Sequence, residues 1–235
     1  MAKRLVYYVD SDHNLQHQEL EFKWFSGFSV SQKQKSVDDL HKNFLKKHPK
    51  LRIIEISTAG SNELGTKLSA VNLNMKTTKG IFTVEQLFQA GKSFKKSGNN
   101  LEFLKLDGRE ARRINKQRNS EDELIGFELF GKKFPLEPKT LFYNWLYLCA
   151  LKQHKDLQKA LLDYSAFTDI YAAPDYTLNT QAEACALYVS LCKQNLWTKA
   201  MLNVQNFKEV VYDTKNEVKS DKDISVEQLE LLGGR

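Results

Sequence analysis

The sequence has few of the residues that mark a secreted or membrane-bound protein. Its 235 residues include three cysteines, Cys149, Cys185 and Cys192, and no two of them have C-x-x-C spacing. An odd number of cysteines cannot form a closed disulfide framework, which argues against a disulfide-stabilised fold. No run reaches the roughly 18 apolar residues of a membrane helix, and Asp10 comes too early for a signal peptide. We therefore expect a cytoplasmic protein without a membrane partner.

Several motifs of common enzyme classes are also missing. There is no G-x-G-x-x-G after a strand, no G-x-x-x-x-G-K-[ST], no H-E-x-x-H and no G-x-S-x-G. These absences argue against a Rossmann enzyme, a P-loop NTPase, a zincin and an α/β-hydrolase. The five histidines are scattered without the spacing of metal ligands. We expect neither a metal nor a cofactor.

The composition is that of an ordinary folded protein with a basic body. Apolar residues make up 41%, aromatic residues 11% and charged residues 27% of the chain, close to globular averages. The net charge is +6, but residues 208–235 carry five basic and seven acidic side chains, so residues 1–207 carry 30 minus 22, or +8. A basic surface favours polyanionic partners, although many basic proteins bind none. We expect one domain over residues 1–207 and a flexible charged tail over residues 208–235.

The spacing of apolar residues predicts a predominantly helical α+β fold with a few short strands. The expected strands span residues 4–9, 19–24, 52–57 and 124–130. One helix is expected after a cap at Ser31, one from a cap at Thr83 to about residue 96, and one with Pro138 in its first turn. Further helices are expected over residues 108–118, 155–164 and 178–194, and a weak one over 226–232. Parallel β-α-β order is missing, which argues against a doubly wound sheet.

Two segments have residues suited to ligand contact. The small residues and glycines of loop 58–66 suit close approach of the backbone to a ligand, or a plain connection. A basic stripe with i, i+3, i+4, i+7 spacing is formed by Arg109, Arg112, Arg113 and Lys116. Such a stripe suits phosphates, but a solvated helix face has the same pattern.

The stretch Phe82 to Phe94 is the strongest candidate for a reactive centre. On a helical wheel, Glu85, Gln89 and Lys92 fall on the border between the apolar sector and the polar sector. Side chains on that border emerge at the rim of a core, where the wall of a cleft would lie. Glu85 and Lys92 would be about 10 Å apart along the helix axis, a separation short enough for both side chains to contact one ligand. Glutamate and lysine on a helix are, however, usually solvated.

This stretch, FTVEQLFQAGKSF, resembles the Val-Glu, Gln-Ala and Lys-Phe signature helix of the NADAR (YbiA-like) family. Further blocks occur in the order seen in NADAR antitoxins that are paired with DarT-type toxins. These blocks are residues 54–58, 68–73, 109–113, 135–138 with 142–147, 167–170 and 179–182. The resemblance runs from Val6 to about Phe207 and implies a single NADAR/YbiA-like domain.

The resemblance also implies an activity and partners. It implies an ADP-ribosyl hydrolase that cleaves an N-glycosidic bond and removes ADP-ribose from guanine bases in DNA. Such a protein would act as an antitoxin or anti-defence factor against a DarT-type toxin, with ADP-ribosylated DNA or ADP-ribose as its ligand. The sequence departs from the pattern of this family at two places. Gly98-Asn99-Asn100 stands in place of a Gly-Gly-Pro-Tyr-like turn, and Asn144 stands where a Tyr-Asp-Trp motif has its aspartate. The second departure leaves the role of position 144 open.

Cleavage of this bond passes through an oxocarbenium-like state, so the site needs a carboxylate near the ribose. Glu85 is the expected carboxylate. Lys92 either balances phosphate charge or, as a neutral amine, attacks C1 of the opened sugar to form a Schiff base. The expected substrate-binding residues are Gln89 and Asp169, Ser69 and Asn72 for ribose or phosphate, Arg109 and Arg112 for the diphosphate, and Trp145 or Tyr147 for stacking, with Trp145 equally suited to the core.

Two other functions fit the same sequence. The first is an N-glycosidase that acts on a small nucleotide-like metabolite, as other YbiA-like proteins suggest. The second is a non-catalytic module that inhibits a toxin by contact, with the charged tail as its docking element. The basic body favours a nucleic-acid substrate only slightly over a metabolite.

Overall fold

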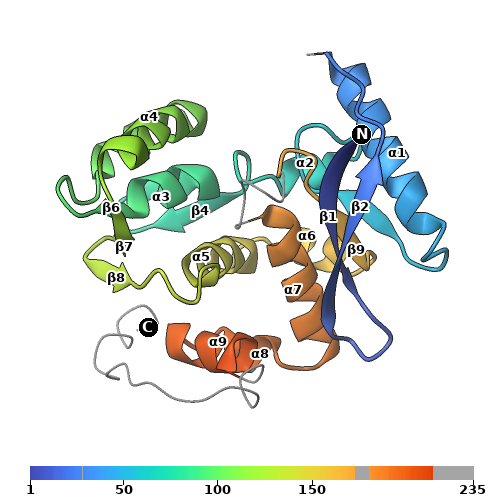
Figure 1. Cartoon of the computed structure of the whole chain (residues 1–235). Helices are drawn as coiled ribbons and strands as arrows, with labels where there is room; N and C mark the ends of the chain where they lie inside the picture. Colours follow the sequence, from blue (N-terminus) through green and yellow to red (C-terminus); the bar gives the residue numbers. More distant parts are fainter. Residues whose placement is uncertain (28, 173–179, 214–235) are drawn as a thin grey trace.

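A computed structural model describes residues 1–27, 29–172 and 180–213 of the chain (Figure 1). The strands in these residues are β1 (Ala2–Val9), β2 (Leu15–Phe22), β3 (Ile53–Glu55), β4 (Asn74–Thr77), β5 (Gly80–Thr83), β6 (Lys92–Phe94), β7 (Leu124–Leu129), β8 (Lys132–Phe134) and β9 (Ala166–Thr168). The helices are α1 (Val30–Leu45), α2 (Glu63–Lys67), α3 (Val84–Gly91), α4 (Gly108–Glu121), α5 (Leu141–Lys152), α6 (Lys155–Leu161), α7 (Gln181–Lys193), α8 (Trp197–Ala200) and α9 (Val204–Val211), with a 3-10 helix, η1 (Leu101–Lys105). The predicted α+β architecture is confirmed.

The largest sheet has the strand order β2-β1-β9-β3, and its strand β1 carries buried side chains on both faces. β1 pairs antiparallel with β2 and with β9, whereas β3 runs parallel to β9. Because side chains alternate along a strand, Val6 packs on one side with Phe22 and Phe44, and α1 covers this side. Val9 and Phe167 belong to the main core, and α7 packs against β1 and β9.

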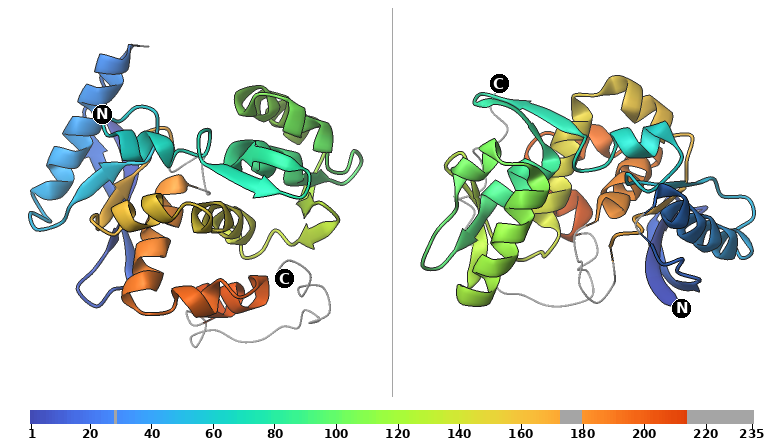
Figure 2. Two further views of the ribbon diagram at one scale, coloured as in Figure 1. Left: turned by 180° about the vertical axis from the view of Figure 1, so that it is seen from behind. Right: turned by 90° about the horizontal axis from the view of Figure 1, so that it is seen from above.

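Helix α5 passes through the centre of the molecule, and its residues 141–148 are all buried. It packs against α3 and α7. Seen from above, α3 and α4 lie on one side of the molecule and the β1–β2 hairpin with α1 on the other, with α5 and α7 between them (Figure 2). Phe142 of α5 stacks with Phe88 of α3 and Phe127 of β7, so these aromatic rings join α3 to the small β6-β7-β8 sheet. None of the helices within the described ranges could span a membrane.

Helix α3 ends at Gly91, five residues earlier than the sequence predicts, and the placement of Lys92 on its helical stripe is wrong. Lys92 is the C-cap with extended backbone angles, and it begins β6 opposite Phe127. A Cβ on Gly91 would lie 2.8 Å from Cζ of Phe142, so the helix end approaches the core too closely for any side chain. Pairing with β7 therefore overrides the helical spacing of this segment.

Two other predictions also differ from the structure. Pro138 precedes α5, which begins at Leu141, so its expected place in the first helical turn is wrong. Loop 58–66 contains the start of α2. Its two glycines approach the protein itself, because a Cβ on Gly60 or Gly65 would meet Glu55. These glycines therefore permit close packing against β3.

The C-terminal helix α9 runs past residue 207, where the domain boundary was expected. Phe207 is fully buried, and its ring lies 5.4 Å from that of Trp145. The hydroxyl of Tyr212 lies 3.0 Å from Oγ1 of Thr140, so residues beyond 207 still pack on the domain. Most of the expected tail, including the weak helical run at 226–232, lies outside the described residues.

Candidate active site

A buried carboxylate lies in the first turn of α3. Thr83 and Gln86 form a capping box that fixes where the helix begins, and Glu85 follows the cap with only 2% of its surface exposed. Its Oε1 accepts a hydrogen bond from Nε of Arg112 at 2.8 Å and one from Nε2 of Gln89 at 3.0 Å. Within the described ranges, no donor reaches Oε2. One carboxylate oxygen is held by the protein, and the other accepts no hydrogen bond from the described residues.

Helix α4 presents one face to this carboxylate. Gly108, Arg112 and Asn115 have i, i+4, i+7 spacing, which places them in one row. A Cβ on Gly108 would lie 2.7 Å from Cγ of Glu85, so the close approach of the two helices requires glycine there. Nδ2 of Asn115 donates to the backbone oxygen of Gln89 at 2.7 Å and to its Oε1 at 3.1 Å. Sequence reasoning missed Gly108 and Asn115, although their spacing around Arg112 was visible.

Lys92 lies beside this carboxylate even though it has left the helix. Its Nζ is 5.1 Å from the centre of the Phe88 ring. Burial lowers the pKa of the Lys92 ammonium; the charge of Glu85 opposes this shift and that of Arg112 adds to it. Because burial is the largest of these influences, the neutral amine is favoured more than at an ordinary lysine. A neutral amine is the nucleophilic form.

Asp169, immediately after β9, provides a second carboxylate near the same cation. Burial and the neighbouring carboxyl group of Glu55 raise the pKa of Asp169 to about 7, while Arg112 lowers it. Asp169 also hydrogen bonds with Gln181 at the start of α7. Oε1 of Gln181 accepts from the backbone nitrogen of Ala70 at 2.6 Å, and the oxygen of Ala70 accepts from the nitrogen of Glu85 at 2.9 Å. The end of β9 is thus joined to the start of α3 through Ala70.

A buried polar network supports the segment that carries Asp169. Glu55 accepts hydrogen bonds from the hydroxyls of Ser57 and Thr168 and from the nitrogen of Ile170. The Thr168 hydroxyl in turn accepts from Nε2 of His41 at 2.8 Å. Burial lowers the pKa of His41 to about 4, so its ring is neutral near pH 7. Sequence reasoning missed this network, although a single acid within the apolar segment 53–56 is a recognisable signal.

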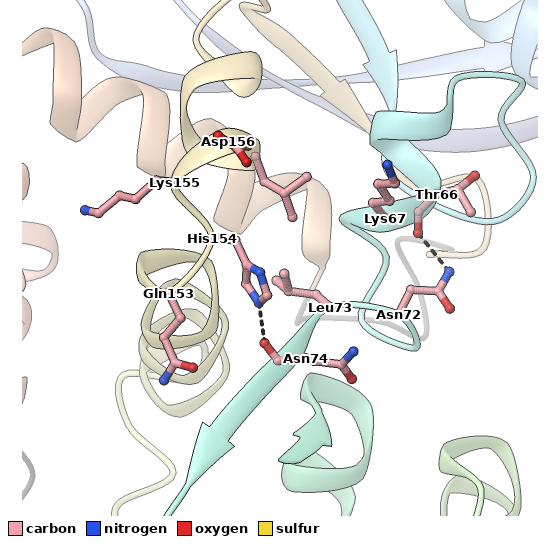
Figure 3. A pocket seen from close by; sticks show the side chains of 10 residues that line it. Thr66, Lys67, Asn72, Leu73, Asn74, Gln153, His154, Lys155 and Asp156 are labelled. Carbon is pink, nitrogen blue, oxygen red and sulfur yellow. Dashed lines mark hydrogen bonds between the residues drawn. The ribbon is translucent and has the colours of Figure 1, made fainter.

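Ser69 and Asn72 lie on the turn that connects α2 to β4. The hydroxyl of Ser69, which is buried, donates to the backbone oxygen of Thr66 at 2.7 Å, and Nδ2 of Asn72 donates to the same oxygen at 2.9 Å. Asn72 lines a cavity of about 500 Å³, drawn in Figure 3, together with His154 and the residues around the start of β4. Asn72 thus lines a separate hollow, whereas Ser69 does not line it and adjoins Ala70, whose backbone oxygen accepts from the nitrogen of Glu85.

The remaining predicted residues are not gathered around Glu85. Arg109 is exposed on α4, next to the row that faces α3. Trp145 packs in the core, and Tyr147 is fully buried with its hydroxyl donating to the oxygen of Leu68 at 2.6 Å. A role for either ring as a stacking face does not fit these positions. Among the predicted residues, the structure brings Glu85, Gln89, Lys92, Arg112 and Asp169 together.

The departure at Asn144 has a local explanation. Its Nδ2 donates to the hydroxyl of Tyr212 at 3.2 Å and to Oε1 of Glu183 at 3.4 Å. A carboxylate at this buried position would face the acidic group of Glu183 without a donor to offer, and like charges repel at this range. The amide nitrogen is thus satisfied, whereas Oδ1 of Asn144 is buried without a hydrogen-bond partner among the described residues.

Comparison with known proteins assigns a family to this arrangement. A family model described as DarT1-associated NADAR antitoxin matches residues 2–221. Among the curated proteins, none matches the chain.

The raised pKa of Asp169 predicts how stability changes with pH. The unfolded chain loses this proton near the ordinary value of 3.8, whereas the folded protein keeps it up to about 7. The folded state therefore binds more protons in this window, and its free energy of unfolding falls as the pH rises. Asp169→Asn cannot ionise, so urea denaturation should show a smaller fall for this variant than for the wild type. The exposed Asp163→Asn is the control and should follow the wild type; an Asp169→Asn curve parallel to the wild type would contradict the assignment.

Proposed function

The chain belongs to the family of DarT1-associated NADAR antitoxins, and from this premise we propose that the Glu85 site removes ADP-ribose from guanine bases in DNA. In this role the protein hydrolyses an N-glycosidic bond and reverses the modification made by a DarT-type toxin. The observation that carries the proposal is the half-satisfied carboxylate of Glu85. Its Oε1 is held by Arg112 and Gln89, and its Oε2 has no protein donor within the described residues.

The chemistry follows from the charge that develops during cleavage. As the bond between C1 of the ribose and the guanine nitrogen breaks, positive charge accumulates on the sugar. A buried carboxylate that is already positioned by two donors stabilises this charge without having to reorganise. Arg112, whose side chain is 62% exposed, pairs with Glu85 through Nε and offers its outer nitrogens to the diphosphate. The guanine nitrogen takes up a proton as it leaves, and water supplies the new hydroxyl at C1.

Lys92 supports a covalent version of this reaction. The ribose first opens: the bond from C1 to the ring oxygen breaks, that oxygen takes up a proton, and C1 becomes doubly bonded to the guanine nitrogen. The neutral amine of Lys92 then adds to C1, and the bond from C1 to the guanine nitrogen breaks as that nitrogen takes up a proton. Water then hydrolyses the resulting imine, which releases ADP-ribose and restores the amine. The lowered pKa of Lys92 makes the neutral amine more accessible than at an ordinary lysine, which supports this route.

Glu85→Gln should abolish most of the release of ADP-ribose from guanine-ADP-ribosylated DNA. Glutamine keeps the shape and the acceptor for Arg112 but carries no charge, so we expect a loss of about a hundredfold or more. Glu110→Gln, on the exposed surface of α4, is the matched control and should retain activity.

Three substrates separate this proposal from its alternatives. Released ADP-ribose is measured with guanine-ADP-ribosylated DNA, thymine-ADP-ribosylated DNA and free ADP-ribosylated nucleotides. Preference for free nucleotides would favour the metabolite N-glycosidase. No release from any of them, with Glu85→Gln still protecting cells from the toxin, would overturn the hydrolase in favour of a contact inhibitor.

Borohydride reduction tests the covalent route. If Lys92 forms an imine with the sugar, reduction during turnover should leave an ADP-ribosyl adduct on the protein, detectable by mass spectrometry. Lys92→Ala should lack this adduct, whereas the exposed Lys95→Ala should retain it. An adduct that persists in Lys92→Ala, or no adduct in the active wild type, would contradict the covalent route and leave Lys92 as a charge-balancing group.

A further inference from the structure

Two large aromatic side chains are left exposed at one end of the largest sheet, and a cation lies over each. Trp24, which follows β2, is 38% exposed, and Tyr171, which follows β9, is 45% exposed. Cζ of Arg4 lies 5.4 Å from the centre of the Trp24 ring, and Nζ of Lys33 lies 5.5 Å from that of Tyr171. Exposed aromatic rings with attendant cations are a surface of the kind that binds nucleic-acid bases and phosphates.

Arg4 connects the two segments that carry these rings. Its Nε donates to the backbone oxygen of Ile170 at 2.6 Å, one residue before Tyr171, while its guanidinium lies over Trp24. The end of β2, the start of α1 and the chain leaving β9 meet at the end of the sheet where the N-terminus lies (Figure 1). We call Arg4, Trp24, Lys33 and Tyr171 the aromatic–basic surface.

This surface adjoins the site that contains Glu85. The backbone nitrogen of Tyr171 donates to Oδ1 of Asp169 at 3.1 Å. Asp169 lies within electrostatic range of Arg112, which pairs with Glu85. A strand whose modified base sits at Glu85 would therefore pass beside Asp169 and reach Tyr171 first.

We propose that the aromatic–basic surface binds unpaired DNA next to the modified guanine, with bases stacked on Tyr171 and Trp24 and phosphates bound by Lys33 and Arg4. This inference rests on the proposed function, because it assumes that the substrate is a DNA strand rather than a free nucleotide. Bases in a duplex are already stacked on each other and offer no free face, so the surface selects single strands. The excess positive charge of residues 1–207 favours the same polyanion.

Binding of unmodified single-stranded DNA tests the surface without any catalysis. The probe is a short dye-labelled oligonucleotide of mixed sequence, and its fluorescence anisotropy is measured with the full chain. Tyr171→Ala and Trp24→Ala should each weaken binding about tenfold, because a base–aromatic stack contributes roughly 1–3 kcal/mol. Tyr171→Phe keeps the ring and should bind like the wild type. Leu202→Ala, an exposed apolar side chain on the C-terminal side of α8, is the control and should also bind normally.

A kinetic measurement separates failure of this inference from failure of the proposed function. The ratio of kcat/KM for ADP-ribosylated oligonucleotide to that for ADP-ribosylated guanosine should fall about tenfold in Tyr171→Ala, through KM for the oligonucleotide. If wild type releases ADP-ribose but neither this ratio nor DNA binding changes in the variants, the surface is not the DNA site. Equal binding of duplex and single-stranded DNA by the wild type would also overturn the inference. Loss of DNA binding in Tyr171→Ala but not in Tyr171→Phe supports stacking on Tyr171, even if no hydrolysis is found.

Discussion

The hydrogen-bonded ion pair between Glu85 and Arg112 sets the arrangement of the rest of the site. A carboxylate that is 98% removed from solvent is costly unless it is paired and hydrogen bonded. Arg112 and Gln89 meet this need from two different helices, and Gly108 and Asn115 hold those helices close enough for the pair to form. The result is a buried charge with one oxygen that accepts no hydrogen bond from the described residues, and the proposed reaction places the positive charge of the sugar there.

The same ion pair also acts on Lys92. Burial lowers the pKa of its ammonium, and the charge of Arg112 adds to this shift while that of Glu85 opposes it. In the proposed reaction, Glu85 stabilises charge on the sugar and Lys92 supplies a nucleophile to it. Asp169, whose pKa of about 7 places it between its two protonation states near neutrality, lies within electrostatic range of Arg112 and accepts a hydrogen bond from the nitrogen of Tyr171. A single arginine thus connects both carboxylates.

Local signals were sufficient to predict part of this structure. The cap at Thr83 follows from residues within one helical turn, whereas Glu85 and Gln89, which were expected at the rim of the core, are buried. Lys92 was misplaced because its strand pairing with Phe127 involves residues about 35 positions away, which helical spacing does not report. The contact of Glu55 with Thr168 joins residues 113 positions apart, and that of Arg4 with Ile170 joins residues 166 positions apart. The expected stacking residues Trp145 and Tyr147 are buried in the core. The exposure of the Trp24 and Tyr171 rings could be recognised only in the structure, because the sequence does not distinguish buried from exposed aromatic side chains.

The central claim is that the reacting sugar binds at Glu85 and not in another hollow of the protein. A crystal structure of the Glu85→Gln protein with ADP-ribosylated guanosine tests it most directly. The account predicts that C1 of the ribose lies within contact distance of the side chain at position 85, on the side away from Arg112, with Nζ of Lys92 directed at it. A ribose bound in the cavity beside Asn72 and His154, with the side chain at position 85 still enclosed by protein, would contradict the account.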